Sequence, residues 1–175
     1  FKELKKDLEI RGHSFLSKTD TEVIICAYEE WGEKFLEKIN GMFAFAIFNK
    51  DSKELFIARD RLGEKPLYYY IDNEIFVFAS EIKAILQNDK IERKLEPQGI
   101  ANYFMFGNSI APDTIYHGIK KLLPGHSLLF KNGQISIKEY WSLKVNVGEK
   151  DQGKEYYKEG IKSILENSVK ERLIS

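Results

Sequence analysis

Short apolar runs separated by turn residues mark the stretch from residue 41 to residue 80 as the centre of the predicted fold. Four such runs follow one another in a pattern typical of an antiparallel meander: Met42–Phe48, Leu55–Ala58, Leu67–Ile71 and Ile75–Ala79. The first run is apolar at almost every position, so we expect it to be covered on both faces. Asp72-Asn73, between the last two runs, predicts a β-hairpin. We expect the rest of the chain to pack on this sheet.

Two helices are predicted before the sheet, and a short further helix over Glu33–Ile39 follows the second one after Gly32. Leu4 and Leu8 lie at helical spacing among lysines and glutamates, and Gly12 predicts the end of the first helix. Thr19 and Glu22 have the spacing of a capping box, in which each side chain accepts the other residue's backbone N–H. An apolar stripe then continues the second helix: Val23, Ile24, Ala27, Tyr28 and Trp31. Between the two helices, the alternating segment His13–Ser17 predicts a short edge strand.

After the sheet, two more helices and one more hairpin are predicted, and the first of these helices is short, over Ser80–Leu86 with Ser80 as its cap. Pro97 suits the first turn of a helix, whose apolar side is formed by Ile100, Tyr103 and Phe104. Asn132-Gly133 lies between two β-rich runs and is the strongest short hairpin signal in the chain. Helices on either side of antiparallel strands predict an α+β domain.

The last thirty residues predict a different organisation. Residues 144–153 are polar and glycine-containing, which is typical of a linker. A helical stripe without an obvious partner follows: Tyr157, Ile161, Ile164, Leu165, Val169 and Leu173. We therefore expect residues 1–143 to form one domain, 144–153 a linker, and 154–175 the first helix of a second domain. Both ends of the sequence lie inside helical patterns, so we expect a chain truncated at both ends.

Charge and composition exclude several classes of partner. Lysine plus arginine and aspartate plus glutamate are equal at 27 each, so the net charge favours neither nucleic acid nor an anionic membrane. No apolar run approaches the roughly 18 residues of a membrane span, and no secretion signal is visible. A single cysteine excludes an internal disulfide and fits a reducing cytosol. We expect a cytoplasmic protein.

Asp20 is the first candidate for binding chemistry. It takes the first helical position beside the positive end of the helix dipole, and the predicted capping box does not need its carboxylate. Asp20 is therefore free to bind an ammonium group. The alternative is that it is an ordinary solvated residue of a helix start.

The charged connection Arg59–Pro66 is the second candidate. Clustered charge between strands usually indicates a solvated turn, which Gly63 and Pro66 would make stiff. Alternatively, this connection forms part of an interface or ligand site.

The remaining candidate residues favour structural roles. Cys26 lies between apolar neighbours on a predicted helix, where a cysteine is most often a small buried hydrophobe. The three histidines, His13, His117 and His126, are scattered and show no metal-site pairing. No glycine-rich phosphate loop is present.

Five strings of residues resemble the glutamine-hydrolysing asparagine synthetases, in that family's order and over nearly the whole chain. They are Thr19–Val23, Ile39–Ala46, Ala58–Tyr69, Phe78–Ala84 and Leu123–His126. The resemblance implies an Ntn-hydrolase fold, an αββα four-layer sandwich of antiparallel sheets, here without its first strands. It also implies an enzyme, a carbon–nitrogen ligase that takes an amide nitrogen from glutamine for amidation of aspartate.

The resemblance also implies where the site residues lie. The family's nucleophile is an N-terminal cysteine, and this residue and the oxyanion-hole residues are expected upstream of Phe1. No catalytic residue is therefore expected within residues 1–175, and the chain alone is expected to be inactive. Asp20 matches the position that binds the glutamine α-amino group, and Thr19 is a weaker candidate for the same pocket.

The resemblance implies further partners outside this sequence. ATP and Mg are expected for the synthetase domain that follows in the family, and no cofactor or metal is expected within residues 1–175. Glutamine, that synthetase domain and a second copy of the chain in a homodimer are the expected partners. Two alternatives remain: an amidotransferase of the same family with another carboxylate or a sugar as acceptor, and a glutaminase-like module that binds or scaffolds without hydrolysis.

Overall fold

The structure is a computed structural model that describes residues 2–145 and 151–173. The chain divides into two compact units, Phe1–Ser142 and Leu143–Ser175. Residue 1, residues 146–150 of the predicted linker and residues 174–175 lie outside the described residues. Within the described part, no helix combines the length and the apolar character needed to cross a membrane.

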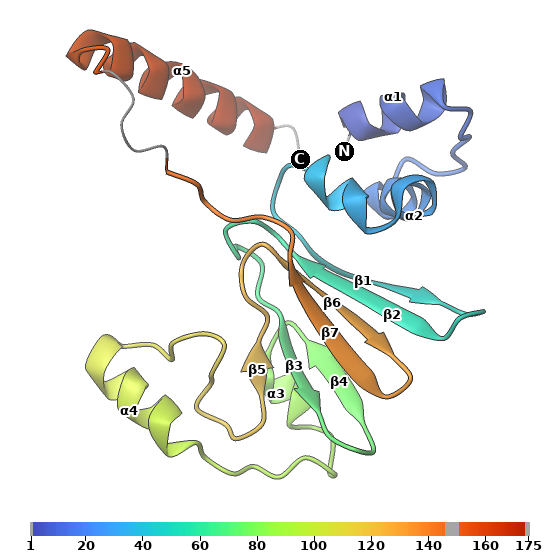
Figure 1. Ribbon diagram of the computed structural model, residues 1–175, viewed down its shortest axis with the longest axis vertical. Coiled ribbons are helices and arrows are strands. Elements are labelled where there is room, and N and C mark those ends of the chain that lie inside the picture. The colour runs from blue at the N-terminus through green and yellow to red at the C-terminus, as the bar shows by residue number, and fades with distance from the viewer. Residues whose placement is uncertain (1, 146–150, 174–175) are drawn as a thin grey trace. The chain divides into compact units, whose positions relative to one another are not determined.

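The first unit contains two antiparallel sheets (Figure 1). Sheet A has the strand order β1-β2-β6-β7, with bounds Ala44–Asn49, Glu54–Arg59, His126–Lys131 and Gln134–Glu139. Sheet B has the order β4-β3-β5, with bounds Phe76–Ala79, Tyr68–Ile71 and Lys120–Lys121. The four strands predicted between residues 41 and 80 therefore exist. They do not form one sheet, however, because the chain leaves sheet A after β2 and enters sheet B at β3.

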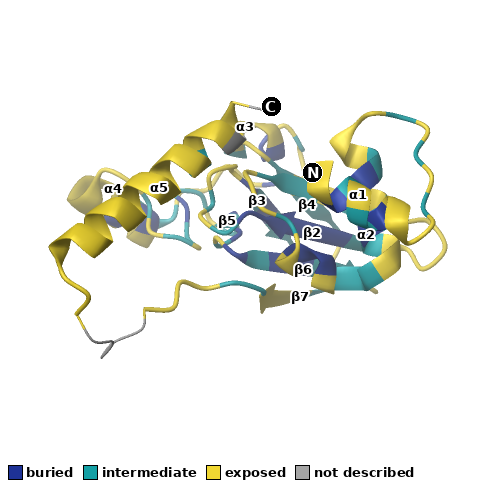
Figure 2. Ribbon diagram, turned by 90° about the horizontal axis from the view of Figure 1, so that it is seen from above, coloured by how far each residue is buried: buried dark blue, intermediate teal, exposed yellow. Residues whose placement is uncertain are grey.

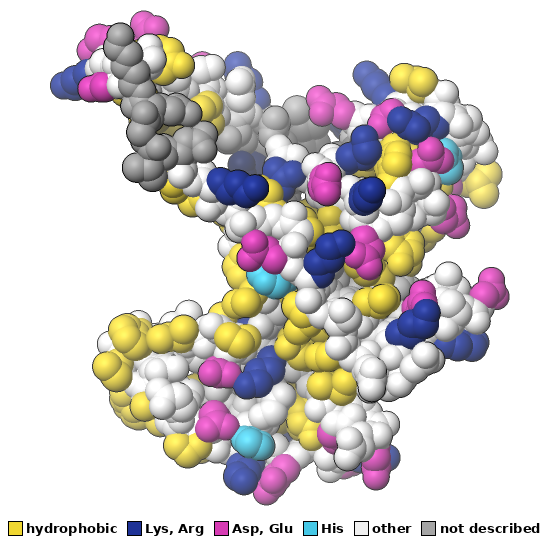
Figure 3. All heavy atoms as spheres, viewed as in Figure 1, with side chains coloured by type: hydrophobic (Ala, Val, Ile, Leu, Met, Phe, Trp, Pro, Cys, Tyr) yellow, Lys and Arg dark blue, Asp and Glu magenta, His cyan; other side chains and the backbone are white. Residues whose placement is uncertain are grey.

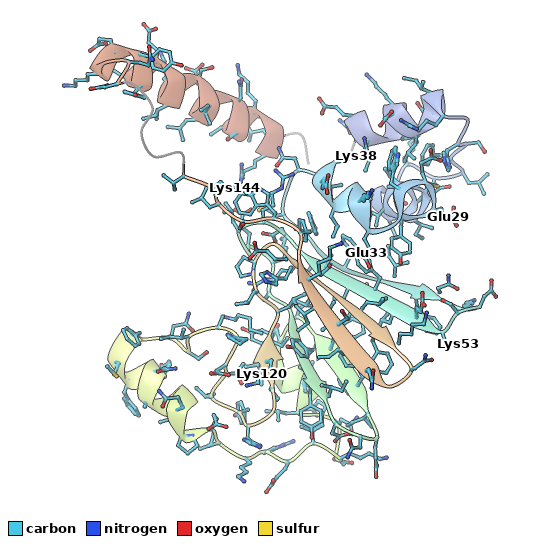
Figure 4. The ribbon with its side chains drawn as sticks, viewed as in Figure 1. Glu29, Glu33, Lys38, Lys53, Lys120 and Lys144 are labelled. Atoms are coloured by element: carbon cyan, nitrogen blue, oxygen red, sulfur yellow. The ribbon has the colours of Figure 1, made fainter. Side chains whose placement is uncertain are left out.

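Helices cover one face of sheet A. They are α1, α2 and the 3-10 helix η1, with bounds Lys2–Ile10, Asp20–Trp31 and Gly32–Glu37. Phe56 and Ala58 point from β2 into the core that these helices share with the sheet. Lys138 on β7 also donates from Nζ to Glu33 Oε2 of η1 at 3.3 Å, and Glu33 is labelled in Figure 4.

The other face of sheet A packs against sheet B. Because side chains alternate along a strand, Ile57 points away from the helices and joins a second core with Leu128 and Tyr69. Phe76 of β4 stacks on Phe130 of β6 with ring centroids 4.7 Å apart. The two sheets therefore form the inner layers of a sandwich.

The outer face of sheet B is covered in turn. Ile85, in the short helix α3 (Ile82–Ile85), packs with Ile91 and Ile119 against the side chains of Tyr68 and Tyr70. Figure 2 shows the resulting pattern, with buried positions concentrated on β2 between the layers. The predicted αββα order of layers is confirmed.

The expectation that Met42–Phe48 is covered on both faces is wrong. β1 is an edge strand of sheet A, and β2 beside it is the buried strand. The side chain of Phe48 remains 55% exposed. An unbroken apolar run indicates that a strand can be buried, but the position in the sheet decides which strand is.

The apolar side predicted for the helix that starts at Pro97 is not the side through which this helix packs. The helix itself is α4 (Pro97–Phe106), but it packs through Gly99 and Asn102. A Cβ on Gly99 would lie 2.1 Å from the carbonyl oxygen of Thr114, so only glycine permits this approach. Phe104 is 82% exposed, and hydrophobic side chains gather over α4 in Figure 3.

The two predicted hairpins form, with different turns. Asn132 and Gly133 both have positive φ, 50° and 76°, as a two-residue turn between β6 and β7 requires. Between β3 and β4, Ile71 pairs with Phe76, so the loop contains four residues rather than two. The carboxylate of Asp72 accepts the N–H groups of residues 74 and 75 and stabilises this longer loop.

The second unit contains α5, which runs from Lys154 to Arg172. The predicted helix is confirmed over these residues. Its apolar stripe is exposed, from 45% at Tyr157 to 78% at Leu173 just beyond the helix. The assignment of this helix to a second, larger domain stays a prediction.

Candidate functional site

The charged connection between β2 and β3 folds inward around one carboxylate. Asp60 is 1% exposed. Its Oδ1 accepts the backbone N–H groups of Leu62 at 3.2 Å and Glu64 at 2.9 Å. Its Oδ2 accepts those of Lys65 at 2.9 Å and Phe43 at 3.3 Å. These four backbone donors satisfy the hydrogen-bonding capacity of the buried carboxylate.

Arg59 binds the same connection through backbone carbonyls. Its Nε donates to Lys65 O at 2.7 Å, Nη1 to Leu122 O at 2.5 Å and Nη2 to Gly63 O at 2.6 Å. Burial lowers the pKa of the Arg59 guanidinium, and the neighbouring charge of Asp60 opposes this shift. The interpretation of this connection as an ordinary solvated turn is therefore wrong for its first two residues.

Two residues next to β6 and β7 also form hydrogen bonds with the backbone of this connection. Tyr140 donates its hydroxyl to Arg59 O at 2.7 Å, and Gly125 donates its N–H to Asp60 O at 2.9 Å. Burial raises the pKa of Tyr140 to about 12, with the charge of Asp60 adding to the shift. The tyrosine therefore remains a protonated hydrogen-bond donor at physiological pH.

A cavity of about 330 Å³ opens beside this connection. Its walls come from the start of α2, the segment that leads into β1, the β2–β3 connection and the residue after β4. They include Asp20 and Thr21, residues 42–45, Lys65 and Pro66, and Ser80. The volume is at the lower end of the range for small-molecule sites, and aromatic and polar groups share its lining.

The structure places Asp20 on the wall of this cavity, as the first residue of α2. Its carboxylate accepts one weak hydrogen bond, from the hydroxyl of Thr21 at 3.5 Å, and forms no ion pair with any described residue. Thr19 is not among the lining residues, and its hydroxyl accepts the N–H of Glu22 and contacts Ser17. Ligand binding by Asp20 and Thr19 stays a prediction.

Only half of the predicted capping box forms at this helix start. Thr19 accepts the N–H of Glu22, but the carboxylate of Glu22 accepts the N–H groups of Leu16 at 2.8 Å and Ser17 at 2.7 Å. The Ser17 hydroxyl and these N–H groups lower the pKa of Glu22. Because its N–H groups are used here, the segment His13–Ser17 is not the predicted strand.

The charge on the cavity wall is mixed. Lys65 also lines the cavity and carries a positive charge, and its side chain forms no ion pair with a described residue. None of the histidines joins them: His13 contacts Glu30, His117 contacts Glu96, and His126 contacts Pro124 O. Over residues 2–145 and 151–173, no group of three or more potential ligands could hold a metal ion.

Cys26 lies on α2 and packs against the core between this helix and sheet A. Burial raises the pKa of its thiol, with the charges of Glu29 and Glu22 adding to the shift. Since the thiolate is the reactive form, a raised pKa makes this cysteine a poor nucleophile at neutral pH.

We expect iodoacetamide to alkylate Cys26 more slowly than free cysteine at pH 7, because burial and two nearby carboxylates reduce its thiolate fraction. The rate can be followed by intact-protein mass spectrometry. Glu29→Gln should raise the rate, while Glu9→Gln, on another helix, should leave it unchanged. Alkylation as fast as that of free cysteine would contradict the assignment.

Several cavity residues were not predicted from the sequence as site residues. Thr21, Phe43 and Ser80 belong to three separate elements, and no short spacing connects them. Lys65 and Pro66 belong to the charged connection, for which the sequence leaves a ligand-site interpretation open. The sequence feature that indicates a site here is the combination of opposite charges with Gly63 and Pro66 in this connection.

Comparison with protein families places most of the first unit in one family. Residues 1–141 match the family model described as "Glutamine amidotransferase domain". These residues include the cavity and the whole β2–β3 connection.

Curated relatives are similar over most of this chain. Asparagine synthetase [glutamine-hydrolyzing] 3 of Bacillus subtilis (strain 168) is 36% identical over 177 residues, which cover 99% of this chain and 28% of the relative. Putative asparagine synthetase [glutamine-hydrolyzing] 2 of Methanocaldococcus jannaschii is 38% identical over 161 residues, 90% of this chain and 31% of the relative. The chain thus spans less than one third of the length of these relatives.

Solved structures support the fold. A structure of glutamine phosphoribosylpyrophosphate amidotransferase from B. subtilis, complexed with ADP and GMP, matches with a TM-score of 0.55 and 21% identity. The match covers 83% of this chain and 27% of that one. At this identity the likeness shows the sandwich fold alone.

Proposed function

Because the chain belongs to the glutamine amidotransferase domain family, we propose that its cavity binds glutamine and that the intact protein carrying it releases ammonia from the glutamine side chain. The observation that supports this most directly is the position of Asp20. A carboxylate without an ion pair, on the wall of a cavity of suitable volume, suits the α-ammonium group of an amino acid. Thr19 would be a subsidiary contact.

We further propose aspartate as the acceptor of the nitrogen. The support is the similarity to glutamine-hydrolysing asparagine synthetases over 99% of this chain. Among the described residues, no group of three or more potential metal ligands occurs. In this proposal ATP and Mg act in another part of the intact protein, which is cytoplasmic. A homodimer is a further proposal from the family resemblance.

The nucleophile is not expected from the residues that line the cavity. Cys26 is the single cysteine in the sequence and its thiol has a raised pKa. We propose that the attacking thiol is supplied by a segment outside residues 1–175. The role of this chain is then to bind and orient the substrate, with Asp20 taking the ammonium group.

An assay of the intact protein tests this function. We expect glutamate release from glutamine, and asparagine formation from aspartate with ATP, Mg and either glutamine or ammonium as nitrogen donor. Residues 1–175 alone serve as the comparison and should release no glutamate. Hydrolysis of glutamine without asparagine formation would favour another acceptor.

A non-hydrolysing module is the competing function. It predicts glutamine binding, measured by calorimetry, without any glutamate above a buffer control. Absence of both binding and hydrolysis in the intact protein would contradict the proposed function altogether.

A further inference from the structure

Two of the cavity walls are far apart in the sequence, and both are hydrogen-bonded to one buried side chain. One wall is the segment 42–45 that leads into β1, and the other is formed by Lys65 and Pro66. Asp60 does not line the cavity itself but contacts both of these walls. Its Oδ2 accepts the N–H of Phe43 from the first wall and the N–H of Lys65 from the second.

This link is reinforced on each side. Asp60 also donates its own N–H to Phe43 O at 2.9 Å, so the first wall is bound by two hydrogen bonds. On the second wall, Lys65 is bound from both directions: its N–H by Asp60 and its carbonyl oxygen by Arg59. The side chain is 1% exposed, so water cannot readily replace these bonds.

We propose that Asp60 is a positioning residue for the substrate site: its carboxylate sets the separation of the two cavity walls and thereby the affinity for glutamine. The inference rests on the proposed function for the identity of the ligand. It does not rest on any contact between Asp60 and the ligand, because Asp60 is not among the residues that line the cavity.

Asp60→Asn tests the inference with little change in volume. Each carboxylate oxygen accepts two N–H groups, so whichever way the amide is turned, its NH₂ group faces two N–H donors. In the intact protein we expect the KM for glutamine to rise about tenfold. We expect the KM for ammonium in glutamine-independent synthesis to stay unchanged.

Thr114→Val is the matched control for lost stability. Thr114 is also 1% exposed, and its hydroxyl bonds to Tyr116 O, Ile119 O and the N–H of Tyr116. It does not line the cavity. This variant should lower the melting temperature but leave the KM for glutamine unchanged, provided that kinetics are measured well below both melting temperatures.

Amide hydrogen exchange supplies a readout that does not need the ligand. In Asp60→Asn, peptides covering residues 43–45 and 62–67 should both exchange faster than in the wild type, whereas in Thr114→Val they should not. If Asp60→Asn does not fold, Gly63→Ala disturbs the same connection, because the added Cβ would lie 2.9 Å from Arg59 Cζ. It should raise the KM in the same direction.

The outcomes separate the two proposals. A wild-type KM for glutamine in the folded variant, or exchange that is unchanged at either wall, would overturn the role of Asp60. If the wild-type protein does not act on glutamine, the proposed function fails, and the exchange comparison alone decides whether Asp60 holds both walls.

Discussion

Asp20→Asn is expected to raise the KM for glutamine about tenfold in the intact protein, with ammonium-dependent synthesis nearly unchanged. The substitution removes the charge that we propose to bind the α-ammonium group and keeps the shape of the side chain. Because Asp20 is exposed on the cavity wall, solvent weakens the proposed contact, and its loss should cost about 1.5 kcal/mol of binding free energy, the lower end of the range for hydrogen bonds to charged groups. Steady-state kinetics with each nitrogen donor measure the effect.

A substrate without the ammonium group provides the sharper comparison. Glutaramic acid, which is glutamine without its α-amino group, should bind the wild type and Asp20→Asn equally, since the proposed contact is absent in both. Glu3→Gln controls for the helix dipole, because Glu3 is a first-turn acid of α1 that does not line the cavity. A parallel fall of glutamine- and ammonium-dependent activity would show instead that Asp20 is structural.

Arg59→Met is expected to cause the largest loss of stability, about 3–5 kcal/mol of unfolding free energy. It leaves three carbonyl oxygens, of Gly63, Lys65 and Leu122, without their guanidinium donors. It also leaves the buried charge of Asp60 without its cationic neighbour. For a unit of this size the melting temperature should fall by roughly 10 °C. Urea unfolding followed by circular dichroism measures the change.

Arg61→Met is the matched comparison. Arg61 lies two positions away and donates from Nη2 to Glu37 O at 3.2 Å, near the surface. Its ring contact with Trp141 is also long, 5.9 Å to the centroid. We expect a loss below about 1 kcal/mol. Equal losses for Arg59→Met and Arg61→Met would contradict the assignment of Arg59 as the buried anchor.

Local patterns were sufficient for most of the elements. Helix starts at Thr19 and Pro97, the turn at Asn132-Gly133 and the strands between residues 41 and 80 all follow from signals that act over a few residues. These signals depend on backbone geometry and on side chains of near neighbours, and the chain carries both with it.

Burial was predicted less well, because it depends on contacts between distant segments. The apolar run before residue 49 became an edge strand, and the helix α4 packs through Gly99 rather than through its aromatic residues. Lys120, labelled on β5 in Figure 4, belongs to a two-residue strand with no pattern of its own. It pairs with β3 only because the fold brings them together.

The sequence by itself determined most of the elements, the resemblance to one family and the position of Asp20 at the start of a helix. Only the tertiary structure decided that the strands divide into two sheets, that Arg59 and Asp60 are buried while Arg61 is not, and that a cavity joins Asp20 to Lys65. The physical reason is that periodicity indicates which residues can be buried. Strand pairings between residues far apart in the chain, such as Ile57 with Leu128, decide which segments meet.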